Sequence, residues 1–253
     1  MLPAQTGIEG YPVIIEATQA RRQSSLITWR LFLAAHGTRQ VEPDFHPVLM
    51  TPQSIPSGLV GKVKVTSTAE ELTEESARDA LRTFIKSEMP LLVGGDRTLV
   101  PALKDLSLVN FETTGEGYAA TYRELSFGYP IVGGYGNLEI RIKRNGEIIK
   151  LHSTLFPRIP FPARPQADVT RFSEALKDRE FTYTGIAGRP LKYRVGASDP
   201  INVKELVVYP KEEENRILLY LAYPVEVGQG TTFTVFFDAV TGDELDARPN
   251  FVS

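Results

Sequence analysis

The fold of this chain is decided by the stretch Tyr122–Phe156, which reads YRELSFGYPIVGGYGNLEIRIKRNGEIIKLHSTLF. From Asn137 to Lys143 apolar and charged residues alternate, which is the period of a half-buried strand. Asn145-Gly146 follows, and this pair is a strong hairpin signal because both turn positions favour positive φ. Ile148 to Leu151 then returns the chain. The stretch predicts a tight antiparallel hairpin that follows a glycine-rich loop.

The composition is that of an ordinary folded protein. The 253 residues are 42% apolar and 23% charged, so the chain can bury a substantial core and wholesale disorder is not expected. The formal net charge is −3 and no cluster of Lys or Arg occurs, which argues against nucleic-acid binding. The chain has no cysteine, which excludes disulfides, thiolate chemistry and cysteine metal sites.

Two features of the sequence bear on membranes and export. No run of about 18 apolar residues occurs, so we expect no transmembrane segment. The first residues, MLPAQ, lack the charged and apolar regions of a signal peptide. We therefore expect no signal sequence at this end of the chain.

Residues 1–67 are predicted to form an N-terminal, mostly β region. Ile27 to Leu33 alternates in the manner of a strand with Trp29 facing inward. Four prolines between residues 36 and 57 interrupt regular pairing. Strand character resumes between Gly58 and Val65.

The clearest helix is predicted from Thr73 to Met89. Thr73 can cap its N-terminus, and the acidic residues Glu74 and Glu75 suit the positive end of the helix dipole. Apolar residues recur at i, i+3, i+4, i+7 and i+8, which makes one apolar stripe: Ala77, Ala80, Leu81, Phe84 and Ile85. Pro90 is expected to end the helix, because proline lacks the N–H of the hydrogen-bond ladder.

The second half of the chain is predicted to repeat this plan of a helix followed by strands. Four prolines make residues 157–165 a stiff connector. Asp168 can then cap a short helix, and a hairpin is expected to turn at residues 185–188. Three alternating strands are expected to close the chain: Leu206–Tyr209, Ile217–Tyr223 and Phe233–Phe237.

Together these elements predict an α+β fold of two related small units, each a helix packed on an antiparallel meander, plus the N-terminal mostly β region. The predicted domains are the N-terminal region 1–67, a first module 68–156, the connector 157–165 and a second module 166–253.

Two stretches carry a family likeness. Residues 122–134, with the strand and Asn145-Gly146 turn that follow, resemble the propeptide module of fungalysin/thermolysin-type metalloproteases. Residues 205–245, with a strand ending in FDAVTG, are similar to the PepSY domain of those precursors. The likeness covers roughly residues 70–246, and residues 8–67 have no counterpart in it. The resemblance implies a stand-alone propeptide-like protein, secreted or held at the cell envelope.

Candidate catalytic and metal-binding groups are sparse. The only histidines, His36, His46 and His152, lack the spacing of a zinc protease. His36 and His46 share a loop, for which a solvated loop is favoured over a metal site. His152 has no Gly-x-Ser-x-Gly elbow near it, and Gly133-Gly134 lacks the Lys-Ser/Thr ending of a phosphate loop. The acids after the last strand lack the spacing of a calcium loop: Asp238, Asp243, Glu244 and Asp246. We expect no enzyme activity, cofactor or metal.

The expected function is that of a non-catalytic binding protein, an inhibitor or folding modulator of a secreted metalloprotease or another envelope protein. It would offer a sheet edge or its tail to an extended cleft. The alternative is an extracytoplasmic scaffolding or envelope-binding module that uses the N-terminal region. Binding residues are predicted in the glycine-rich loop and the tail: Tyr129, Pro130, Gly133, Gly134, Tyr135, Asn137 and Phe251. Of these, Tyr129 and Tyr135 are expected to be exposed interface anchors.

Overall fold

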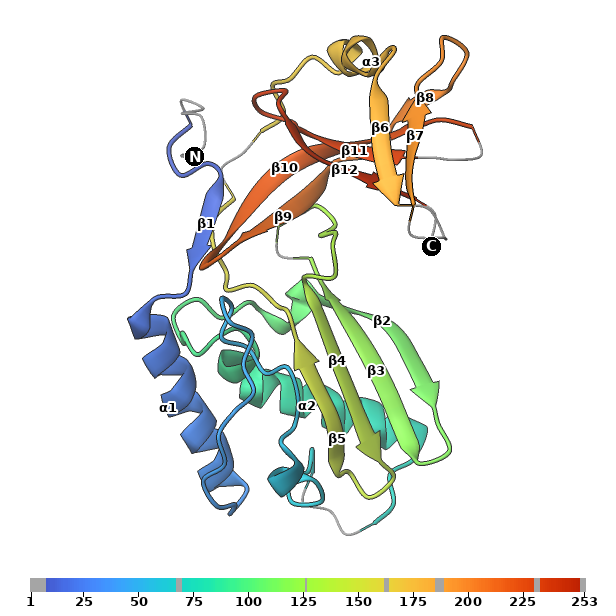
Figure 1. Cartoon of the computed structure of the whole chain (residues 1–253). Coiled ribbons are helices and arrows are strands. Elements are labelled where there is room, and N and C mark those ends of the chain that lie inside the picture. The colour runs from blue at the N-terminus through green and yellow to red at the C-terminus, as the bar shows by residue number, and fades with distance from the viewer. Residues whose placement is uncertain are drawn as a thin grey trace. The chain divides into compact units, whose positions relative to one another are not determined.

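The computed structural model describes residues 8–66, 70–125, 127–161, 164–184, 189–229 and 233–250, and its described part is α+β (Figure 1). The chain divides into two compact units. The α2 unit comprises Ile14–Pro160 and Glu212–Leu218, and the α3 unit comprises Met1–Val13, Phe161–Lys211 and Leu219–Ser253. The predicted α+β class is confirmed. Residues 14–66 belong to the α2 unit.

The sheet of the α2 unit is a four-stranded antiparallel meander. Its strands, in spatial and chain order, are β2 (Leu106–Thr113), β3 (Gly117–Glu124), β4 (Asn137–Lys143) and β5 (Ile148–Ser153). The predicted alternation holds, since Leu138, Ile140 and Ile142 are all buried. The β4–β5 turn differs in detail from the prediction. Only Gly146 has positive φ (+79°), and its N–H bonds to the Lys143 carbonyl, as in a type I turn closed by a glycine bulge.

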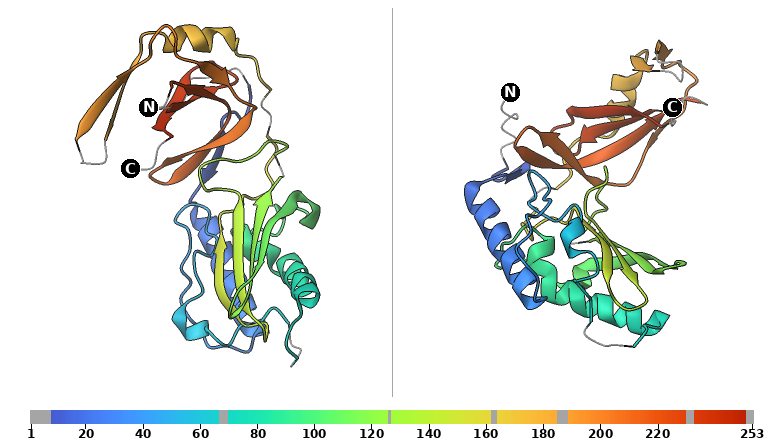
Figure 2. Two further views of the ribbon diagram at one scale, coloured as in Figure 1. Left: turned by 90° about the vertical axis from the view of Figure 1, so that its right-hand side faces the viewer. Right: turned by 60° about the horizontal axis from the view of Figure 1, so that its bottom comes forward.

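Helix α2 (Glu74–Leu92) covers one face of this sheet (Figures 1 and 2). The predicted N-cap is confirmed, because the Thr73 hydroxyl accepts the backbone N–H of Ser76 and Ser76 reciprocates. The predicted end at Pro90 is wrong, since the helix continues to Leu92. Because Pro90 has no N–H, the backbone carbonyl of Lys86, one turn earlier, lacks its helical hydrogen bond. Lys86 is exposed, so water can bond to this carbonyl and the helix can continue.

The strand predicted at Ile27 to Leu33 is also wrong. These residues lie inside helix α1 (Gln19–Ala35), which follows the short strand β1 (Val13–Glu16) and is capped by Thr18. The largest element of the N-terminal region is therefore helical. The buried face of α1 consists of Ser25, Thr28, Trp29, Phe32 and Leu33. The core of the α2 unit lies between α1, α2, the sheet and the short 3-10 turn η1 (Ser57–Leu59); a second turn, η2 (Leu103–Asp105), leads into β2.

The α3 unit contains the second helix-on-sheet arrangement. Helix α3 (Thr170–Leu176) is followed by the hairpin β6 (Glu180–Thr184) and β7 (Pro190–Arg194), whose turn lies outside the described residues. The larger sheet has the order β1-β10-β11-β12, with β8 and β9 also pairing with β10. Its other strands are β8 (Ile201–Val203), β9 (Val207–Glu213), β10 (Arg216–Val227), β11 (Phe233–Asp238) and β12 (Glu244–Pro249).

Stacked aromatic rings join α3 to this sheet. Phe172 of α3 stacks on Phe237 of β11 with ring centroids 4.5 Å apart, and Phe181 of β6 stacks on Phe233 at 4.6 Å. The predicted helix on a meander is thus present in both units. Two details of the prediction are wrong. Strand β9 runs through Pro210, which it tolerates because, among the described strands, only β10 pairs with it and leaves its other side as an edge. A further strand, β12, follows the last predicted strand.

Within the described ranges, no helix has the length and apolar character needed to cross a membrane.

Candidate functional site

The glycine-rich loop between β3 and β4 is shaped by its glycines. Gly133, Gly134 and Gly136 have φ of +79°, +84° and +69°, a region that residues with side chains rarely adopt. At Gly136 an added Cβ would also lie 2.6 Å from the Ile131 side chain. The glycines therefore have a structural role in the loop, whatever the loop binds.

The predicted binding residues lie along this loop with different exposure. Pro130, Gly133 and Gly134 are exposed, so the loop presents mostly backbone to solvent. Tyr129 is half-buried, and Asn137 is half-buried with its Nδ2 donating to the Tyr135 carbonyl at 3.2 Å. Phe251 lies outside the described residues.

Tyr135 is held by three internal contacts. Its ring stacks on Phe156, with centroids 5.7 Å apart, and meets the edge of His46 at 5.9 Å. Its hydroxyl donates to the Glu212 carboxylate at 2.9 Å, and burial, with this hydrogen bond, raises the pKa of Tyr135. The expectation of a free, exposed anchor is therefore wrong for Tyr135. Glu212 lies 77 positions away in the chain, so no local pattern could have indicated this contact.

The loop around His46 packs beside Tyr135. His46 is buried, and its Nδ1 accepts the backbone N–H groups of Val48 and Leu49, each at 3.2 Å. The predicted solvated loop is therefore wrong for this residue. A ring nitrogen that already accepts two N–H groups has no lone pair left for a metal. In the part of the chain that the structure describes, no three His, Asp or Glu side chains gather as a metal site.

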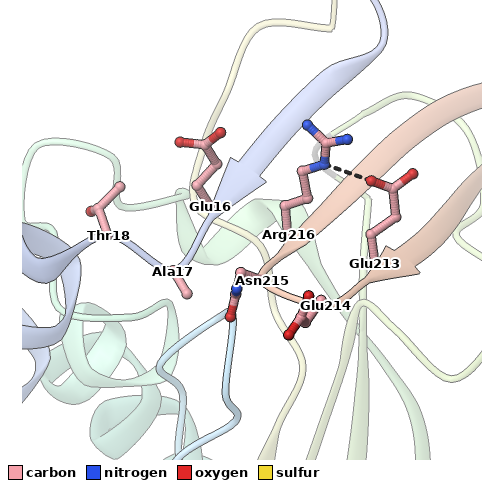
Figure 3. Close-up of a pocket in the computed structure, with 7 residues that line it drawn as sticks. All are labelled: Glu16, Ala17, Thr18, Glu213, Glu214, Asn215 and Arg216. Carbon is pink, nitrogen blue, oxygen red and sulfur yellow. Dashed lines mark hydrogen bonds and ion pairs between the residues drawn. The ribbon is translucent and has the colours of Figure 1, made fainter. Parts of the chain in front are cut away.

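Two cavities of the α2 unit are lined in part by the β9–β10 turn. The first, of about 500 Å³, is lined by Glu16, Ala17, Thr18, Glu213, Glu214, Asn215 and Arg216 (Figure 3). Arg216 pairs with Glu213 at 2.6 Å, and the Thr18 hydroxyl caps α1. Both groups therefore have structural partners. The lining offers carboxylates and an amide but no nucleophile placed against a base.

The second cavity, of about 550 Å³, shares Ala17 and Asn215 with the first. The backbone carbonyl of Asn215 accepts the backbone N–H of Ala17 at 3.0 Å, which joins the turn to the segment before α1. The remaining lining comes from α1 and from the loop around His46: Arg22, Leu26, Glu42, Pro43, Asp44, Phe45, His46, Pro47 and Met50. This cavity combines apolar walls with charges of both signs.

Of the four acids predicted to be solvated, Asp243 and Glu244 are exposed, whereas Asp238 and Asp246 are not. Asp238 is almost fully buried, and its Oδ1 accepts the Tyr11 hydroxyl at 2.7 Å and the Val240 N–H at 2.8 Å. Asp246 accepts the Tyr209 hydroxyl at 2.7 Å and pairs with Arg248. These two carboxylates serve the structure of the α3 unit.

The two edges of the meander in the α2 unit differ. At the β5 edge, the N–H of Ser153 donates to Pro52 and the N–H of Ile148 to Val63, at 2.8 and 2.9 Å, so the loop segments cover it. At the other edge, none of the described strands pairs with the outer side of β2. Val109 interrupts the β2–β3 register and is 50% exposed. The β2 edge is therefore the open edge of this sheet.

Comparison with known proteins gives little further information. No protein-family model matches the chain, and no curated protein matches it. The C-terminal domain of YpeB from Bacillus megaterium is a remote structural neighbour, with a TM-score of 0.34 and 12% sequence identity over 92% of this chain and 98% of that one.

Proposed function

We propose that this protein is a non-catalytic binding module that takes up an extended segment of a partner protein along the β2 edge. The observation that carries the proposal is the difference between the two sheet edges. The β5 edge is covered by the chain's own loops, while the described strands leave the outer side of β2 open. An open edge presents unpaired N–H and C=O groups, which an extended peptide can pair with.

Side chains beside this edge supply apolar contact area. Leu108 and Val109 of β2 are exposed, as is Leu125 just beyond β3. Arg78 of α2 lies over the Phe111 ring at 3.9 Å and adds a cation to the helix side of the edge. The register of β2 is unbroken from Asn110 to Thr113, so the regular part of the edge is four residues long. This length suits a short extended segment.

The resemblance of residues 122–134 to a propeptide suggests the class of partner: a secreted metalloprotease of the thermolysin type, whose cleft binds extended chains. Inhibition or assisted folding of that protease would follow from occupation of the cleft. The protein would then act outside the cytoplasm.

The test is binding of the full-length chain to thermolysin and to the metalloproteases secreted by its source organism, with protease activity as a second readout. Val109→Lys and Val109→Glu place charges of either sign on the β2 edge. Val60→Lys is the matched control, because Val60 in the 57–60 turn is similarly exposed and lies off the sheet. We expect both Val109 variants to weaken binding at least about tenfold, which is about 1.4 kcal/mol, and Val60→Lys to leave it unchanged.

The outcomes separate the two parts of the proposal. Absence of binding to every protease tested would refute the partner class. Equal binding by the native chain and both Val109 variants would refute the β2 edge as the binding surface.

One observation favours the scaffolding alternative. Ile27 and Leu31 lie one turn apart on α1 and are 57% and 49% exposed. Arg30 lies between them in the chain, and α1 contains no acidic residue. This face suits an acidic, amphipathic segment of an envelope protein. The double variant Ile27→Gln/Leu31→Gln should then abolish capture of envelope proteins by the purified chain, and unchanged capture would exclude this face.

A further inference from the structure

The loop that carries His46 is closed on itself by backbone hydrogen bonds. Phe45 and Pro52 form an isolated bridge at its base. The N–H of His46 donates to the Thr51 carbonyl at 2.8 Å, and the N–H of Met50 donates back to the His46 carbonyl at 2.9 Å. Met50 has φ of +58°, which is unfavourable for a residue with a side chain. The loop therefore stores some strain that its hydrogen bonds must offset.

The side chain of His46 adds two hydrogen bonds inside the loop. Its Nδ1 accepts the N–H groups of Val48 and Leu49 at 3.2 Å each, and only 8% of the residue is exposed. Nδ1 can accept only while it carries no proton, so these contacts assign the neutral Nε2–H tautomer. A proton on Nδ1 would turn the acceptor into a donor that faces two other donors.

The surroundings of His46 come from five segments of the chain. The charged and titratable groups that face it or share its cavity are Arg22 of α1, Glu42 and Asp44 of the preceding loop, His152 of β5, Glu212 of β9 and Tyr135 of the glycine-rich loop. Burial lowers the pKa of His46, the nearby Glu212 carboxylate opposes this shift, and His152 reinforces it. The net direction favours the neutral ring, in agreement with the hydrogen bonds.

We propose that His46 is a proton-operated latch: the neutral ring holds the 45–52 loop closed, and protonation of Nδ1 opens it. A proton taken from solvent removes both side-chain hydrogen bonds at once and leaves the positive φ of Met50 without that support. The loop forms one wall of the 550 Å³ cavity through Phe45, His46, Pro47 and Met50. Opening would therefore reshape the cavity and disturb the ring contact with Tyr135, whose hydroxyl holds Glu212. This inference does not depend on the function proposed above.

The other two histidines lack this arrangement. His152 Nδ1 lies 3.2 Å from the Gln53 carbonyl, an acceptor, so a protonated ring keeps that contact. His36 is half-buried at the end of α1 against Phe32, and its cap contacts are made by its backbone N–H. Protonation of His36 or His152 is therefore not expected to open the 45–52 loop.

The test is amide hydrogen exchange of the full-length chain, read by NMR as protection factors at Val48, Leu49 and Met50 between about pH 8 and pH 5. In the native chain we expect protection at these amides to fall by up to about tenfold per pH unit below the ordinary histidine pKa of 6.5. The amides of β4 should keep their protection over the same range.

The matched variant is His46→Asn, whose side-chain oxygen can accept N–H groups two and three residues ahead and does not titrate in this range. We expect its loop to stay equally protected at both pH values, while His152→Gln behaves as the native chain does. Protection in the native chain that does not change between pH 8 and pH 5 would overturn the proposal. So would a His46→Asn variant with the native pH dependence. If His46→Asn fails to fold, the ring shifts of His46 and the loop amides, followed in the native chain, decide the question. The chemical shifts of the His46 ring and of the loop amides must then change together, with the same midpoint pH, and different midpoints would overturn the proposal.

Discussion

The buried contact between Tyr11 and Asp238 provides the most direct test of how the α3 unit is held together. The Tyr11 hydroxyl donates to Asp238 Oδ1 at 2.7 Å and accepts the backbone N–H of Leu221 at 3.2 Å. Both side chains are buried, and the two residues are 227 positions apart. The contact ties the N-terminal segment to the FDAVTG turn that the sequence singles out.

Tyr11→Phe removes the hydroxyl and keeps the ring, which makes edge contacts with Phe161 and Tyr220 at 6.4 and 6.1 Å. Asp238 keeps the N–H of Val240 at 2.8 Å but loses its closest donor. A hydrogen bond to a charged group contributes about 1.5–3 kcal/mol, and an orphaned backbone N–H adds about another 1 kcal/mol. We therefore expect a loss of about 2.5–4 kcal/mol in the free energy of unfolding.

The assay is urea unfolding followed by far-UV circular dichroism. With a slope near 2 kcal/mol per molar urea, the midpoint should fall by about 1–2 M. Hydrogen exchange at Leu221 and Val240 then locates the loss. Tyr129→Phe is the control, because the half-buried Tyr129 hydroxyl bonds to no residue in the described ranges, and its loss should stay within about 0.5 kcal/mol. A Tyr11→Phe loss no larger than that of the control would refute the reasoning.

Three further predictions follow from the α2 unit. Thr73→Ala removes the N-cap of α2 and should cost about 1 kcal/mol by urea unfolding, whereas no loss would exclude the cap as a stabilising contact. Gly95→Ala should lower the free energy of unfolding by more than about 2 kcal/mol, since φ is +86° and the new Cβ would lie 2.4 Å from the Ser25 backbone nitrogen in α1. Gly61→Ala is the control, because Gly61 has a similar φ but open space around it, and its loss should be about half as large. Equal losses for the two variants would contradict the steric argument. Burial lowers the pKa of both His36 and His46 in the folded chain. The unfolded chain therefore binds more protons, so stability should be full above about pH 7 and fall as pH drops below 6.5; a urea midpoint that is constant from pH 8 to 5 would contradict this.

Local sequence signals were sufficient where neighbours in the chain are also neighbours in space. Three predicted features depend only on residues that are close together in the chain: the β4–β5 hairpin, the Thr73 cap and the apolar stripe of α2. The hairpin of β6 and β7 likewise follows from alternation on either side of a short turn. Both units could therefore be predicted as a helix on a meander.

Helix α1 shows why the same reasoning failed in the N-terminal region. Ile27, Trp29, Leu31 and Leu33 alternate as a strand would, but Ile27 and Leu31 are exposed. The buried face instead follows the helical period through Ser25, Thr28, Trp29, Phe32 and Leu33. Two of these five are polar, so the apolar pattern alone did not reveal the stripe. At Ser25 the backbone of α1 lies so close to Gly95 that no side chain fits at position 95.

The candidate site was predicted only in part, because its contacts join distant segments. The glycine-rich loop could be found from its composition. The partners of Tyr135 could not, since His46 lies in a loop far before it in the chain and Glu212 in strand β9 far after it. The open β2 edge could not be predicted either. It depends on the 51–53 and 63–65 segments, which cover the β5 edge and not the β2 edge.

The sequence by itself determined the elements whose stability is local: the capped helix α2, the hairpins and the α+β class. Tertiary structure alone decided that α1 is a helix, that Tyr135 is an internal contact and that Asp238 is buried against Tyr11. The physical reason is that a cap or a tight turn is satisfied by groups a few residues apart. Burial of a polar side chain, in contrast, depends on a partner that only the folded chain brings within hydrogen-bonding distance.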